Sequence, residues 1–130
     1  MKKIFKIIAL TLVCIIALSA LTSCGRMYEG VQKKAQKAGF VCYSFEYSEM
    51  APLNRSVHSL GINGEVKSAC IMVNDKGEYA YLYELDKISA AKAFIESFTL
   101  ITGIYDGNID IRRDNKVIIA GDVSAIDKIW

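Results

Sequence analysis

The stretch EVKSACIMVNDKGEYAYLYEL, residues 65–85, decides most of the fold. Two apolar segments flank residues 75–77, which is typical of a β-hairpin whose three-residue loop takes a positive φ at Gly77. We predict a register in which Val73 lies opposite Tyr79. Both faces of both strands carry apolar side chains, so this hairpin should lie in the centre of a sheet.

The chain after residue 85 predicts a helix, a second hairpin and a short last helix. Residues 86–102 carry apolar side chains at helical spacing, and Phe94 should be buried against the sheet. The second hairpin covers residues 108–121, and the last helix follows Asp122. The predicted inward positions are Ile88, Ala91, Phe94, Ile95, Phe98 and Ile101 in the helix, and Ile109, Ile111, Ile118 and Ala120 in the hairpin.

Three further elements are predicted before the central hairpin. Residues 27–38 form a helix that Gly39 ends, because glycine accepts the left-handed conformation of a helix C-terminus. In residues 40–47, alternating side chains predict a strand with one buried face. A short helix should open at Pro52 and close at Gly61. The buried face of the strand would carry Val41, Tyr43, Phe45 and Tyr47.

These elements predict an α+β domain over residues 27–130. Hairpins pair their strands antiparallel, and the helices between them should cover one face of the sheet. We therefore expect a mainly antiparallel sheet of about five strands with helices packed on it. The segment is long enough to bury one core without disulfides or metals.

Residues 1–23 are excluded from this fold, because they have the order of a secretory signal peptide. A basic start with Lys2, Lys3 and Lys6 precedes a mostly apolar, helix-forming run over residues 7–18. The run is shorter than the ~20 residues that a membrane-spanning helix needs. Small residues then lead to Cys24, and the chain turns polar directly after it.

Leu21-Thr22-Ser23-Cys24 resembles the lipobox of bacterial lipoproteins. The resemblance implies that the Cys24 thiol receives a diacylglyceryl group and that a signal peptidase cuts between Ser23 and Cys24. Residues 24–26 would then be a lipidated N-terminus and short tether, holding the domain on a cell membrane and facing outside the cytoplasm. Two or more acyl chains are enough for stable anchoring.

Charge gives no support to nucleic-acid binding. The 16 basic and 14 acidic residues include three lysines of the signal peptide, so the mature chain keeps 13 basic and 14 acidic residues. A nucleic-acid-binding domain would carry a basic patch of its own. We interpret the cluster Lys33, Lys34 and Lys37 as a solvated helix face. The alternative is contact with anionic lipid headgroups near the anchor.

Catalytic and metal-binding patterns are weak. An enzyme could pair His58, the only histidine, with Cys42 or Cys70, but no known signature surrounds them. One histidine and two isolated cysteines do not make a zinc site. We predict no cofactor, no metal and no catalytic residue. Cys42 and Cys70 should be free thiols, because a disulfide would need neighbouring strands with the two residues nearly opposite.

Tyr79, Tyr81 and Tyr83 line one face of a predicted strand. We expect them to pack beneath helices, but exposed they would form a binding surface, since tyrosine joins apolar area to a polar tip. Three functions follow for the lipoprotein. The first is a non-catalytic domain that binds or scaffolds, with a protein partner in the cell envelope. The others are an accessory subunit that tethers or regulates a membrane complex, and a small Cys/His enzyme.

Overall fold

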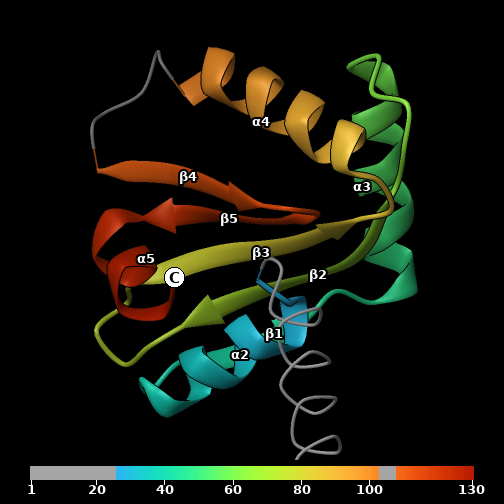
Figure 1. Ribbon diagram of the computed structural model, residues 1–130. Helices are drawn as coiled ribbons and strands as arrows, with labels where there is room; N and C mark the ends of the chain where they lie inside the picture. Colours follow the sequence, from blue (N-terminus) through green and yellow to red (C-terminus); the bar gives the residue numbers. More distant parts are fainter. Residues whose placement is uncertain (1–25, 103–107) are drawn as a thin grey trace, which may run out of the picture.

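The computed structural model describes residues 26–102 and 108–130 (Figure 1). The elements are α2 (Tyr28–Lys37), β1 (Val41–Ser44), α3 (Tyr47–Ser59), β2 (Val66–Val73), β3 (Tyr79–Leu85), α4 (Ile88–Thr102), β4 (Ile109–Asp114), β5 (Val117–Asp122) and α5 (Val123–Ile129). The predicted signal peptide, with Ser23, and the predicted lipidation site at Cys24 lie outside the described residues. The described part is an α+β domain, as the sequence predicted.

The five strands of the described part form one antiparallel sheet in the order β1-β2-β3-β5-β4. The β2–β3 hairpin has the predicted register, with Val73 paired to Tyr79, and Gly77 in its loop has a φ of 78°. Its strands lie inside the sheet, with β3 in the middle. The second hairpin is confirmed as β4 and β5; the sequence suggests a turn at Asp114-Asn115, but the loop is Asn115-Lys116, one residue later, and Asn115 has a φ of 58°.

Helices pack on both sides of the sheet, and not on one side as the element order predicted. Figure 1 views the sheet from the side of α2 and α5, while α3 and α4 belong to the other side. The physical reason lies in β2, β3 and β5, which carry apolar residues on both faces, so both need a cover. The α2/α5 core contains Tyr28, Val31, Ala35, Phe40, Cys70, Met72, Ala80, Leu82, Val117, Ile119, Ala125, Ile126 and Ile129.

The strand predicted over residues 40–47 is shorter and buries its other face. β1 has four residues and lies at the edge of the sheet. Phe40 is buried and Cys42 packs against the α2/α5 core, whereas Val41 and Tyr43 are 54% and 59% exposed. Alternation correctly placed Val41 and Tyr43 on one face. The prediction that this face is buried was wrong for Val41 and Tyr43, because α2 covers the opposite one. Phe45, just after the strand, is partly buried among the residues beneath α3 and α4.

The helix predicted from Pro52 begins earlier, at Tyr47, so Tyr47 is not a strand residue. The first turn is held by Glu49, whose carboxylate accepts a hydrogen bond of 3.4 Å from the backbone N–H of Glu46. Pro52 lies inside the helix, where its missing N–H leaves one backbone carbonyl without the usual partner. Gly61 follows the helix end with a φ of 79°.

The helix predicted over residues 86–102 is confirmed as α4, and Phe94 is buried as expected. Two expected core positions were wrong: Ile88 is 43% exposed and Ile109 is 39% exposed. Both lie at the first residue of their element, where neighbouring elements no longer surround the side chain. The side chain of Ile101 lies outside the described residues.

Candidate functional site

The α3/α4 side of the sheet is covered at one end and accessible at the other. At the covered end, Ala69, Tyr83 and Ile118 pack beneath the two helices. Farther along the same face, apolar side chains remain partly or largely exposed. We call six of them the open face: Val41, Tyr43, Ile71, Val73, Tyr79 and Tyr81.

The open face is continuous across three strands. Its first row pairs Val41 with Val73 and Val73 with Tyr79; its second pairs Tyr43 with Ile71 and Ile71 with Tyr81. Residues directly opposite in an antiparallel sheet have Cβ atoms about 5 Å apart. The six side chains are therefore neighbours on one face and form one apolar surface, to which the tyrosines add hydroxyl groups. Apolar patches of this kind on a domain surface mark interaction sites.

The three tyrosines of β3 become less buried from Tyr83, in the core, to Tyr79 and Tyr81, on the open face. Tyr83 is buried, with its ring centroid 5.3 Å from that of Phe94, and burial raises the pKa of its hydroxyl. The Tyr81 ring stacks on Tyr83 at 6.1 Å, and Tyr79 meets Tyr81 edge-on at 5.9 Å. Tyr79 and Tyr81 are half-buried. Tyr83 thus packs beneath the helices as expected, whereas Tyr79 and Tyr81 stay partly accessible.

Sequence reasoning did not place Val41 and Tyr43 on an exposed surface, although their alternation put them on one face. Exposure depends on how far a helix reaches over the sheet, which strand periodicity does not encode. The open face also ends at β1, which within the described chain pairs only with β2. Edge strands present free backbone N–H and C=O groups to which another extended segment can pair.

The two thiols of the domain lie on the other side of the sheet. Cys42 and Cys70 are free, as predicted, but they are closer than predicted. Their strands are neighbours and both side chains face α2, in diagonal positions, since Cys70 pairs with Ser44. Gln32 contacts both thiols: its side-chain N–H donates to Cys70 Sγ at 3.5 Å, and its backbone carbonyl oxygen accepts from Cys42 Sγ at 3.9 Å.

These thiols do not assemble with His58 into a nucleophile and base. His58 lies on α3, across the sheet, and its Nε2 is 3.0 Å from the carbonyl oxygen of Gly64. Burial, and then the nearby Cys70, raise the pKa of the Cys42 thiol, which disfavours the reactive thiolate. In the described ranges, no three His, Cys, Asp or Glu side chains gather closely enough to hold a metal ion.

A shallow pocket of about 310 Å³ lies where the described chain begins and ends in space. Arg26 lines it and is held in place by two hydrogen bonds: its Nη1 donates to Asp114 at 3.1 Å and its Nη2 to the Trp130 carbonyl oxygen at 3.3 Å. The Arg26 guanidinium carbon also lies 4.6 Å from the centroid of the Trp130 ring. We call it the anchor-side pocket; its lining is Arg26, Met27, Gly30, Val31, Lys34, Ile129 and Trp130.

No protein-family model, curated protein or solved structure matches the chain. None of the helices within residues 26–102 and 108–130 combines the length and the apolar character needed to cross a membrane. The open face and the anchor-side pocket are the two candidate functional surfaces of the described part of the chain.

Proposed function

We propose that this chain is a membrane-anchored lipoprotein of the bacterial cell envelope whose small domain binds a protein partner without catalysis. The observation that carries the proposal is the sequence Leu21-Thr22-Ser23-Cys24 at the end of an apolar run. Cleavage before Cys24 and acylation of its thiol remove the leader and leave a lipid anchor. The domain is then held outside the cytoplasm.

The open face supports the binding role. It combines accessible aromatic side chains with an unpaired sheet edge, β1, and an extended segment of a partner protein can use both. Its backbone would pair with β1, and its apolar side chains would cover Tyr43 and its neighbours. The engagement of His58 with Gly64 and the raised pKa of Cys42 favour this role over a Cys/His enzyme.

A second candidate is an accessory subunit that tethers or regulates a membrane complex. It uses the same lipid anchor and the same open face, and it differs in the partner, which would be an integral membrane protein. The identity of the protein that contacts the open face distinguishes the two.

Lipid labelling in bacterial cells tests the anchor. Cells expressing the full chain are fed an alkyne fatty acid, and the chain is isolated under denaturing conditions. We expect label on the wild type and no label on Cys24→Ala, which should also keep its leader and run at a higher mass. Cys42→Ala is the matched control, because it removes another cysteine and should be labelled normally. Label on Cys24→Ala, or none on the wild type, would overturn the proposal.

A further inference from the structure

The lipid anchor must leave the domain close to the anchor-side pocket. Cys24 lies two residues before Arg26, and each residue spans at most about 3.6 Å, so their Cα atoms are within roughly 7 Å of each other. Arg26 is fixed on the fold, because its backbone N–H also donates to Asp114 at 3.2 Å. A lipid on Cys24 therefore holds this end of the domain at the bilayer.

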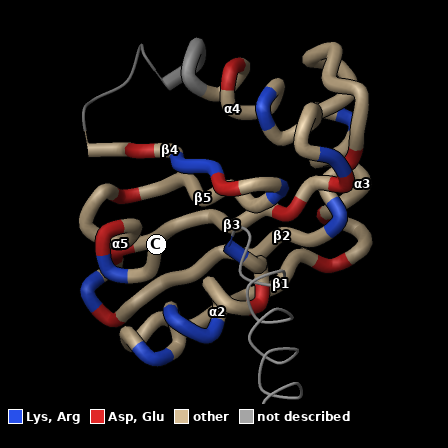
Figure 2. The backbone as a smooth tube through the Cα atoms, in the orientation of Figure 1, with Lys and Arg blue, Asp and Glu red and all other residues tan. Residues whose placement is uncertain are grey.

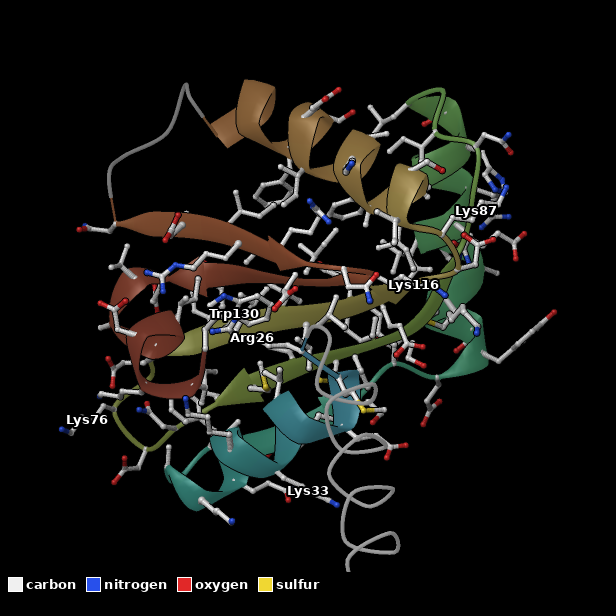
Figure 3. The ribbon with its side chains drawn as sticks, viewed as in Figure 1. Arg26, Lys33, Lys76, Lys87, Lys116 and Trp130 are labelled. Carbon is white, nitrogen blue, oxygen red and sulfur yellow. The ribbon has the colours of Figure 1, made fainter. Side chains whose placement is uncertain are left out.

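The surface at this end has the chemistry of a membrane contact. Figure 3 shows Arg26 and Trp130 side by side, and the blue segments of α2 in Figure 2 are its lysines. Lys33, Lys34 and Lys37 are exposed on that helix, and Lys34 Nζ lies 3.4 Å from the Trp130 carbonyl oxygen. Between the cations, Met27 is 61% exposed. Tryptophan and basic side chains around an apolar centre suit the headgroup layer of a bilayer.

Positive charge predominates on this surface. Asp114 is paired to Arg26, and Glu29 is the acidic residue of α2, against four cations at Arg26, Lys33, Lys34 and Lys37. The lysines are on the helix next to the anchor, so they approach the bilayer whenever the lipid is inserted. Anionic headgroups can replace the water around these cations.

We propose that the anchor-side pocket and the lysines of α2 form a docking surface for the anionic phospholipid headgroups of the bilayer that holds the lipid anchor. This inference rests on the proposed lipidation of Cys24. It fixes the orientation of the domain: α2 and Trp130 face the membrane, and the open face, on the opposite side of the sheet, points away from it toward a partner.

Trp130 reports on this contact directly, because it is the only tryptophan. The mature lipidated protein is reconstituted into vesicles of phosphatidylcholine, with or without phosphatidylglycerol, that contain lipids brominated near the headgroup. With phosphatidylglycerol, the Trp130 emission should shift to shorter wavelength and be quenched by the bromine atoms. Lys33→Glu combined with Lys34→Glu should lower the ratio of docked to undocked protein by roughly tenfold or more.

Lys87→Glu combined with Lys92→Glu is the matched control. It makes the same change of charge at two exposed lysines, one just before α4 and one on it, and α4 packs on the opposite side of the sheet from α2 and Trp130. These variants should be quenched like the wild type. Equal quenching of all three proteins, or no quenching of the wild type, would overturn the docking surface. The intact mass of the same samples keeps the two proposals apart: a lipidated Cys24 without quenching defeats the inference alone, and an unlipidated Cys24 defeats the lipoprotein itself.

Discussion

The two faces of the sheet are built from the same strands but are covered to different extents. On the α2/α5 side, the central hairpin buries Cys70, Met72, Ala80 and Leu82 completely. On the α3/α4 side, the same strands pass from buried Tyr83 to half-buried Tyr79. The closed face stabilises the fold, whereas the partly open one leaves apolar surface accessible, which we propose a partner covers. On this proposal, apolar strand residues serve two purposes within one sheet.

The largest expected effect is a difference in folding stability between variants at the two ends of the α3/α4 side. Phe94→Ala should lower the free energy of unfolding by about 3–5 kcal/mol, because its ring is buried against Tyr83 and leaves a cavity. Tyr43→Ala, on the open face, should change it by less than about 0.5 kcal/mol. Urea unfolding of both variants measures the difference. Similar losses for the two would mean that the open face is part of the core.

A smaller effect on folding stability is expected on the α2/α5 side. There the carboxylate of Glu78, in the β2–β3 loop, accepts a hydrogen bond from Lys128 on α5. Hydrogen bonds from Lys128, then from Ser124 and Asn74, lower the pKa of the Glu78 carboxyl from 4.5 to about 2. Since its pKa is lower in the folded state, Glu78 stabilises the fold fully above about pH 4.5. This contribution is lost as the pH falls toward 2.

Melting temperatures measured between pH 7 and pH 2 test this contact. The wild type should exceed Glu78→Gln by a constant margin above about pH 5, and the margin should shrink as the pH approaches 2. Lys128→Met removes the main cause of the lowered pKa, so most of the same pH dependence should disappear. A margin that is independent of pH would show that Glu78 does not hold α5 in this way.

The sequence predicts the parts of the fold in which local signals agree with the tertiary structure. Gly77 sets the register of the central hairpin, and the spacing around Phe94 sets α4. Helix α3 was predicted too short, because its first turn begins at a glutamate, which is not a common N-cap, and because Pro52 is a typical helix start.

The candidate site was predicted only in part. Alternation identifies the residues that share a face, and it grouped Tyr79 with Tyr81 and Val41 with Tyr43. It does not show how far a helix extends over that face: Tyr83 is buried as expected, but Tyr79 and Tyr81 are only half-buried and Tyr43 is exposed. The anchor-side pocket depends on contacts between Arg26 and Trp130, which are 104 positions apart, and local sequence gives no signal for them.

Site-specific cross-linking in bacterial membranes tests most directly whether the open face binds a protein. A photoreactive phenylalanine analogue replaces Tyr43 in the full chain, and in a control chain it replaces Lys87. Lys87 is exposed and follows Leu85, so it lies beyond the end of β3 that is opposite to Tyr79 and the open face. After irradiation, position 43 should give a discrete product that contains a peptide of one envelope protein, and position 87 should not. The same products from both positions, or no protein product from position 43, would contradict a binding role for the open face.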